Sequence, residues 1–283
     1  MPVLLGLIVA LTYGTGDFFG GLSARRSSAA AVVVRSYAWS LAAMGVVLAV
    51  TRPEAPLASD LVLGVAVGFI GPIGIVLLYK GLATGRMSVV APVTAVGAST
   101  VPVAWGIVTG ERPSVLALLG VSAALVAVVL ISSAPSHPDS FGPPTATTRE
   151  VLPLSIGSGL GFGTVYVLLG STSDRAGIWP LIAARPISVA IVAAGAVATG
   201  RSLRASSVDR WTIAAAGLAD IAANVVFLAA VHRGLLSIVA VVSSLYPAST
   251  VVLARVVLGE RLHRLQLAGL ALAACGVMAM ASG

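Results

Sequence analysis

Long apolar runs separated by short polar gaps make up most of this sequence. Ten runs approach the roughly 20 residues that an α-helix needs to cross the hydrocarbon core of a bilayer. We predict spans at residues 2–22, 30–50, 61–81, 88–108, 114–132, 151–171, 178–198, 211–231, 236–257 and 264–282. The runs are continuously apolar rather than alternating, which argues against a transmembrane β-barrel. Because a helix satisfies its own backbone hydrogen bonds in lipid, we predict an all-α integral membrane protein with ten transmembrane helices.

One gap differs from the others in length and composition. Residues 132–150 read SSAPSHPDSFGPPTATTRE, which is rich in Pro, Ser and Thr and is typical of a flexible linker. It divides the predicted spans five and five. We therefore predict a first five-helix repeat at 1–132, a linker at 133–150 and a second repeat at 151–283.

The two halves share short sequence segments in the same order. GRMSVVA at 85–91 parallels GLLSIVA at 234–240, GERP at 110–113 parallels GERL at 259–262, and GTG at 14–16 parallels GFG at 161–163. Arg35 and Arg185 both fall early in the second span of their half. An odd number of spans per repeat turns the second repeat upside down, as in the inverted repeats of many secondary transporters.

Composition supports the membrane assignment and limits the function. Hydrophobic residues make up 58% of the 283 residues and charged residues only 10%, against roughly 25% charged residues in soluble domains. The net charge of +7 comes mostly from Lys and Arg in short loops between spans, so we expect no nucleic-acid partner. The count in these loops, ten on one side against four on the other, predicts that both termini lie outside.

Other sequence features exclude several kinds of site. The single cysteine, Cys275, cannot form an intramolecular disulfide, and no Cys/His cluster suggests a metal. The first apolar run lacks a basic n-region and contains Asp17, so we interpret it as a span rather than a cleaved signal peptide. We expect no cofactor and no metal.

Several segments resemble the EamA family of the drug/metabolite transporter superfamily. They are YGTGDFFGGLSARR at 13–26, GIWPLIAARP at 177–186 and SLYPASTVVLARVVLGERLHRLQLAGLALAACGV at 244–277. The resemblance implies a ten-span fold in the cytoplasmic membrane and transport of small metabolites without ATP. It also implies cytoplasmic termini, in conflict with the Lys and Arg count.

The second half places ionisable side chains inside its predicted spans. Asp220 lies near the middle of span 8, and Asn224, four residues on, shares its helix face. Arg185 lies at a matching depth in the antiparallel neighbour, so the two charges can pair. An acid at mid-bilayer is costly and by default functional, although a purely structural hydrogen-bonded clamp is the alternative.

The first half repeats this pattern nearer to a membrane interface. Asp17 and Arg35 also lie at matching depths in antiparallel spans, which predicts a second pair. Asp17 aligns near Thr164 and Asp220 near Gly71, so the repeat does not duplicate either acid. We predict that each half contributes its own acid to one cavity, where a carboxylate could also bind protons.

Aromatic and hydroxyl side chains complete the predicted site. Tyr79, Tyr166 and Tyr246 are candidates to line the cavity, as are Tyr13, Tyr37 and Trp39. Trp179 is another candidate, but its place at a span end favours the aromatic belt of the membrane interface. Tyr246 lies beside Ser243 and Pro247, and Pro92 in span 4 is a counterpart, so we predict two broken helices facing the pathway. Glu111 and Glu260 are predicted to cap the next helix. The candidate substrate-binding residues are Asp220, Asn224, Arg185, Tyr246, Ser243, Asp17, Arg35, Tyr79 and Tyr166.

We therefore predict a secondary transporter, a monomer or homodimer, that exports a small amino-acid-like or cationic metabolite with possible proton coupling. An intramembrane enzyme is the first alternative, but no histidine lies deep in a span and no nucleophile–base pattern is visible. A non-transporting scaffold is the second, but it would not need charges within the bilayer. No Walker A sequence is present to drive an ATP-dependent pump.

Overall fold

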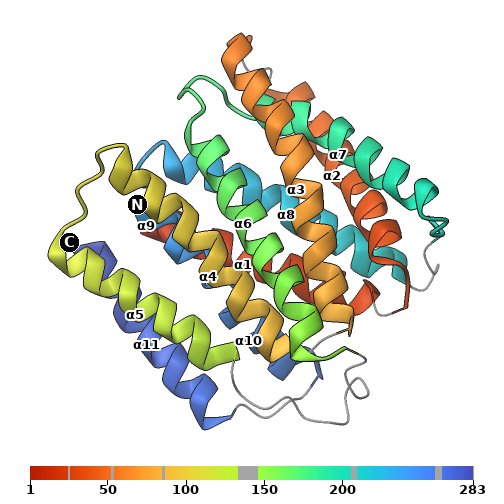
Figure 1. Cartoon of the computed structure of the whole chain (residues 1–283). Helices are drawn as coiled ribbons and strands as arrows, with labels where there is room; N and C mark the ends of the chain where they lie inside the picture. Colours follow the sequence, from red (N-terminus) through yellow and green to blue (C-terminus); the bar gives the residue numbers. More distant parts are fainter. Residues whose placement is uncertain are drawn as a thin grey trace.

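The computed structural model describes residues 1–24, 26–51, 54–84, 87–132, 146–204, 209–258 and 263–282. These residues form helices joined by short connections (Figure 1). The helices are α1 (Pro2–Ala24), α2 (Ala29–Thr51), α3 (Ala58–Thr84), α4 (Met87–Val108), α5 (Val115–Ser132), α6 (Thr148–Gly170), α7 (Trp179–Ala198), α8 (Arg210–Val231), α9 (Leu236–Ser243), α10 (Tyr246–Leu258) and α11 (Arg264–Ser282). The predicted all-α fold is confirmed.

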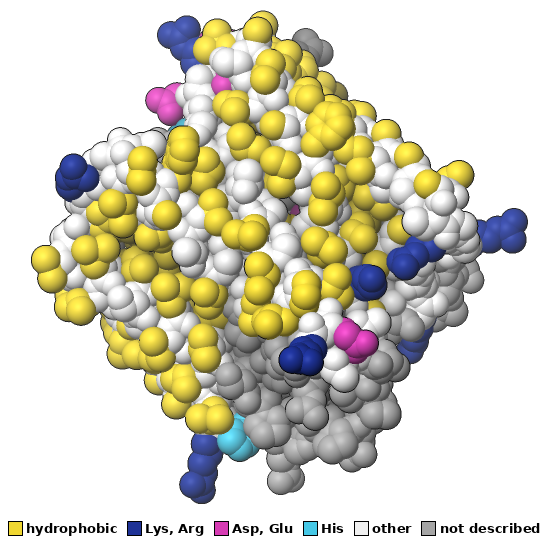
Figure 2. Space-filling model, viewed as in Figure 1, with side chains coloured by type: hydrophobic (Ala, Val, Ile, Leu, Met, Phe, Trp, Pro, Cys, Tyr) yellow, Lys and Arg dark blue, Asp and Glu magenta, His cyan; other side chains and the backbone are white. Residues whose placement is uncertain are grey.

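Length and apolar composition make most of these helices suited to crossing a membrane. Within the described residues, eight helical segments meet both criteria, with α9 and α10 counted as one, and α4 and α5 contribute shorter apolar stretches. Large apolar side chains are exposed on the outside, among them Val108 at 81%, Val256 at 74% and Phe69 at 53%. Figure 2 shows such side chains over much of one face, with Lys and Arg at its edges and in its lower right part. This apolar exterior suits a multi-pass membrane protein.

The predicted spans differ from the observed helices mainly at two places. The ninth span is broken by a turn at Ser244 and Leu245, and Pro247 follows in the first turn of α10, where a helix needs no backbone donor. The break predicted around Pro92 is wrong, because α4 is one continuous helix. α6 begins at Thr148, inside the predicted linker, and residues 133–145 lie outside the described residues.

Helices from the two halves of the chain interleave. α1 packs on α8 and α10, α6 packs on α3 and α4, and α5 lies along α11 at one edge of the bundle (Figure 1). α2 contacts α7 and α8, while α3 contacts α7. The central helices therefore bring residues from both halves to the middle of the molecule.

Two close helix contacts between the halves are built in the same way. Ser40 Oγ on α2 donates a 2.7 Å hydrogen bond to the carbonyl of Gly217 on α8. Ser188 Oγ on α7 donates a 3.1 Å hydrogen bond to the carbonyl of Gly68 on α3. A Cβ added at Gly68 would lie 2.7 Å from the Ala184 carbonyl oxygen, and one added at Gly217 would collide with a carbonyl of α2. Both crossings therefore need glycine for close backbone approach.

The ends of the helices are also joined between the halves. Asp60, at the start of α3, accepts hydrogen bonds from the backbone nitrogen and hydroxyl of Ser173, in the α6–α7 loop, at 2.8 and 2.7 Å. Asp209, just before α8, lies 3.6 Å from the Arg26 guanidinium in the α1–α2 loop. Each acid thus anchors a loop that belongs to the other half.

Candidate functional site

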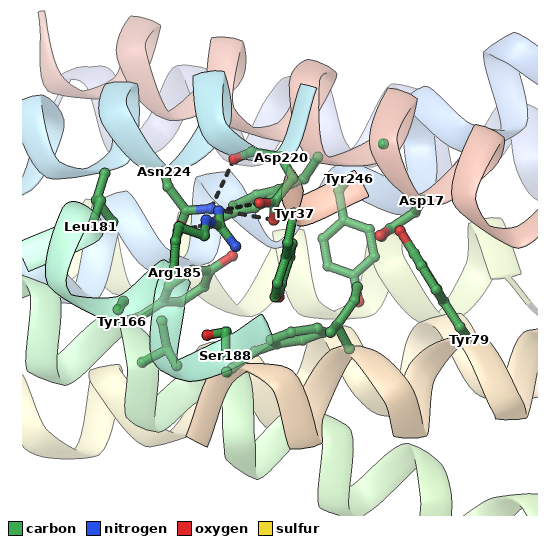
Figure 3. Close-up of a pocket in the computed structure, with 17 residues that line it drawn as sticks. Asp17, Tyr37, Tyr79, Tyr166, Leu181, Arg185, Ser188, Asp220, Asn224 and Tyr246 are labelled. Carbon is green, nitrogen blue, oxygen red and sulfur yellow. Dashed lines mark hydrogen bonds and ion pairs between the residues drawn. The ribbon is translucent and has the colours of Figure 1, made fainter. Parts of the chain in front are cut away.

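A small cavity lies where the central helices meet (Figure 3). Its volume of about 60 Å³ has room for a few water molecules, well below the roughly 300–1,000 Å³ of typical small-molecule pockets. The walls come from α1, α2, α3, α6, α7, α8 and α10. They consist of Tyr13, Gly16, Asp17, Tyr37, Gly71, Ile75, Tyr79, Phe162, Val165, Tyr166, Leu181, Ala184, Arg185, Ser188, Asp220, Asn224 and Tyr246.

One wall of the cavity holds a hydrogen-bonded ion pair. The Arg185 guanidinium on α7 donates to the Asp220 carboxylate on α8, as the matched depths predicted. The two side chains are only 7% and 22% exposed. The guanidinium also lies over the Tyr37 ring, 4.2 Å from its centroid. Arg185 is therefore held by a carboxylate and an aromatic face together, which offsets the cost of burying its charge.

Asn224 connects this pair to the first helix of the chain. It lies one turn after Asp220, and its amide nitrogen donates to the Asp220 carbonyl at 2.8 Å and to Oδ1 at 3.3 Å. Its side-chain oxygen accepts a 3.1 Å hydrogen bond from the Tyr13 hydroxyl. The four side chains of Tyr13, Asn224, Asp220 and Arg185 thus form one network that spans α1, α8 and α7.

Asp17 on α1 occupies a different part of the cavity (Figure 3). Within the part of the chain that the structure describes, its carboxylate makes no hydrogen bond or ion pair. It follows Gly16, where an added Cβ would be 3.6 Å from the Asp220 backbone nitrogen, so α1 and α8 approach each other closely at the level of the two acids. The Tyr79 hydroxyl packs against Gly20, less than one turn from Asp17.

Tyrosines dominate the aromatic part of the wall. The chain has five tyrosines, at positions 13, 37, 79, 166 and 246, and all five line this one cavity. Tyr166 stacks on Phe227 with ring centroids 4.3 Å apart, which fixes its plane. The Tyr246 side chain is 4% exposed, and its hydroxyl is buried without a hydrogen-bond partner among the described residues. Such an unpaired polar group inside an apolar bundle is costly and calls for an explanation.

Seven of the nine predicted site residues line the cavity: Asp220, Asn224, Arg185, Tyr246, Asp17, Tyr79 and Tyr166. Arg35 does not, and its predicted pairing with Asp17 is wrong, because its side chain is exposed. Successive helical residues turn by about 100°. Tyr37, two positions further on α2, therefore faces the cavity on nearly the opposite side of the helix from Arg35.

Ser243 is also absent from the cavity wall. It is fully buried, and its hydroxyl has no partner among the described residues. The turn after α9 changes the helical register, so Tyr246 reaches the cavity while Ser243 packs elsewhere. Trp39 and Trp179 lie off the wall, and no sequence pattern had pointed to Phe162 and Ser188.

Glu111 caps a helix, but not the predicted one. Its carboxylate oxygens accept hydrogen bonds from the backbone nitrogens of Leu236 at 2.7 Å and Ser237 at 3.2 Å. These residues begin α9, in the other half, whereas α5 is capped by the Ser114 hydroxyl. Glu260, its sequence counterpart, lies outside the described residues.

The comparisons with known proteins agree with this architecture. The sequence model of the EamA-like transporter family matches residues 151–282. The match covers the second half of the chain, a little under half of its 283 residues. The EamA resemblance noted in the sequence is thus confirmed for this part of the chain, and the family is one of membrane transporters of the drug/metabolite superfamily.

A solved structure matches over both halves. It is a crystal structure of a protein that is 14% identical in sequence to this chain. The two superpose with a TM-score of 0.76 over 98% of this chain and 95% of the other chain. At that identity the likeness concerns the fold alone. The search of curated proteins finds no match.

Proposed function

We propose that this EamA-like chain is a secondary transporter that carries a small organic solute across the cytoplasmic membrane, and that the cavity around Asp220, Arg185 and Asp17 is its substrate site. The observation that carries the proposal is the gathering of three ionisable side chains in a cavity between membrane-spanning helices. Such groups are costly in lipid and mark substrate or ion pathways.

We propose further that the two halves are inverted repeats and that the cavity lies on the axis that relates them. The duplicated contacts support this proposal. Gly217 follows Gly68 in the sequence by almost the same number of residues as Ser188 follows Ser40, as expected if these residues correspond in the two repeats. The crossed anchors at Asp60 and Asp209 are separated by that interval too.

The same interval pairs cavity residues with each other. To within one position, this sequence separation relates six pairs of residues: Tyr13 and Phe162, Gly16 and Val165, Asp17 and Tyr166, Tyr37 and Arg185, Gly71 and Asp220, and Ile75 and Asn224. Both members of each pair line the cavity. A site on the axis between repeats is the expected place for alternating access.

The small cavity volume fits a cycle in which the halves separate to admit the solute. A pocket of about 60 Å³ must widen for any organic metabolite. Rocking of one half against the other would open it to one side of the membrane and then to the other. The exchange of solute for protons at a cavity carboxylate would drive export without ATP.

A solute screen in proteoliposomes tests this proposal. The purified chain is reconstituted, and uptake of amino acids and organic cations is measured with and without a pH gradient. We expect uptake of at least one solute, lost in Asp220→Asn and kept in Arg35→Gln, which changes an exposed charge away from the cavity. Uptake that Asp220→Asn leaves unchanged would contradict a role for the cavity.

A further inference from the structure

We infer that the cavity selects an organic monocation, held at Asp17 by charge and by tyrosine rings, rather than an amino-acid zwitterion. The inference rests on the proposed function and narrows its substrate class. It follows from the charges in the cavity, from their existing partners and from the chemistry of the surrounding wall.

The charges in the cavity do not balance. Among the described residues, its lining contains two carboxylates, Asp17 and Asp220, and one guanidinium, Arg185, but no lysine or histidine. With all three ionised, the lining has one negative charge in excess. A monocation neutralises that excess, whereas a zwitterion leaves it in place and an anion doubles it.

The single positive group is already engaged. Arg185 is bonded to Asp220 and stacked on Tyr37. A substrate carboxylate at the remaining guanidinium donors would have to share this one positive charge with Asp220. It would also bring two carboxylates together in a buried site, where like charges disfavour each other. Arg185 is therefore a poor site for the carboxylate of an amino acid.

Asp17 is the carboxylate that remains available. Among the described residues it has no ion-pair partner, and it lies on the cavity wall close to the Tyr79 hydroxyl (Figure 3). The buried, unpaired hydroxyl of Tyr246 belongs to the same wall and gives a second, independent sign of an unfilled site. A cationic group between these side chains would meet both a negative charge and polar oxygens.

The concentration of tyrosine fits a cation that is alkylated rather than a bare ammonium. Aromatic faces attract cations, and cages of such rings are the recurrent means of recognising quaternary ammonium groups. All five tyrosines of the chain line the cavity, together with Phe162. A quaternary ammonium needs few hydrogen-bond acceptors, and apart from its charged groups and one amide the wall consists of hydroxyls, rings, and glycine or aliphatic residues.

Choline and glycine betaine provide a matched pair of probes, because both have a trimethylammonium group and only betaine adds a carboxylate. Binding to the purified full chain in detergent is measured by titration calorimetry, with phenylalanine as an amino-acid probe. We expect choline to bind at least tenfold more tightly than betaine or phenylalanine. Asp17→Asn should weaken choline binding at least tenfold, and Arg35→Gln should leave it unchanged.

Two substitutions at Tyr79 distinguish the contribution of the aromatic ring to choline binding from that of the hydroxyl. Tyr79→Phe keeps the aromatic face and should retain most of the choline affinity, while Tyr79→Leu should lose several-fold. These variants keep the test valid if Asp17→Asn does not fold. Equal or tighter binding of betaine or phenylalanine would overturn the inference but leave the transporter proposal intact. Absence of binding by all three probes would overturn the inference, whereas absence of any uptake in the liposome screen would overturn the proposed function itself.

Discussion

The α2–α3 region of the first half and the α7–α8 region of the second half pack alike but differ in chemistry. Each region contributes a serine whose hydroxyl donates to the carbonyl of a close-packed glycine in the other region. Three residues after that glycine, α3 has Gly71 and α8 has Asp220. Seven residues after it, α3 has Ile75 and α8 has Asn224. The contacts that hold the helices together are duplicated, while the Arg185–Asp220 ion pair and the Asn224 amide occur only in the α7–α8 region.

This difference separates folding from function. A close helix crossing depends on small residues and satisfied backbone groups, and both halves need it equally. The proposed function accounts for a single ion pair, because a second pair would take up space in the proposed solute site. Substitutions at packing positions should therefore act alike in the two halves, and substitutions at cavity positions should not.

The largest expected effect comes from breaking the ion pair. Asp220→Asn leaves the Arg185 charge buried without a carboxylate partner, which costs about 3–5 kcal/mol in soluble proteins. We expect a lower unfolding temperature in detergent and loss of transport. The double variant Arg185→Gln, Asp220→Asn should recover much of the stability but none of the transport. Recovery of transport in the double variant would show that the pair only clamps the helices.

The next largest loss of stability should come from filling the close glycine contacts, and it should be equal in the two halves. Gly68→Ala and Gly217→Ala each place a methyl group against the backbone of a facing helix, and overpacking of this kind costs about 1–3 kcal/mol. Gly195→Ala is the matched control, since an added Cβ there meets nothing within 4 Å. Thermal unfolding should fall similarly for the first two and hold or rise for the control. A change in only one of the two would contradict equivalent packing.

The smallest expected loss of stability comes from removing the hydroxyl groups of the two interhelical serines, which should differ in their effect on transport. Ser40→Ala and Ser188→Ala each remove one interhelical hydrogen bond, worth on average about 0.6 kcal/mol in membrane proteins. Stability should fall slightly and equally. Only Ser188 lines the cavity, so only Ser188→Ala should alter the KM for the transported solute. Identical transport kinetics in both variants would argue against a functional difference between the walls.

The sequence predicted the features that depend on depth along a helix. Hydropathy located each span to within a few residues, and matched depths paired Arg185 with Asp220 correctly. The prediction failed where the outcome depends on which side of the helix a residue faces. Arg35 has the right depth for Asp17 but faces away from it, and neither hydropathy nor spacing in a uniformly apolar helix shows which side is inward.

The positions of helix breaks and the alignment of the two halves were also predicted incompletely from the sequence. The turn at Ser244 and Leu245 moved Ser243 out of the predicted site, and a proline alone did not distinguish the broken ninth span from the continuous α4. The GTG and GFG segments suggested that Asp17 aligns near Thr164. The duplicated contacts instead favour Tyr166, because interhelical packing constrains register more strongly than a short glycine pattern does.

The most direct test of a central solute cavity is the reactivity of a cysteine placed in it. Asn224→Cys in a Cys275→Ala background puts a thiol on the cavity wall, and Ala223→Cys puts one at a fully buried position next to it. We predict that a water-soluble thiol reagent modifies the cysteine at 224 and not the one at 223, and that a transported solute slows the reaction. A cysteine at 224 that never reacts, or that reacts equally fast with and without solute, would contradict the account.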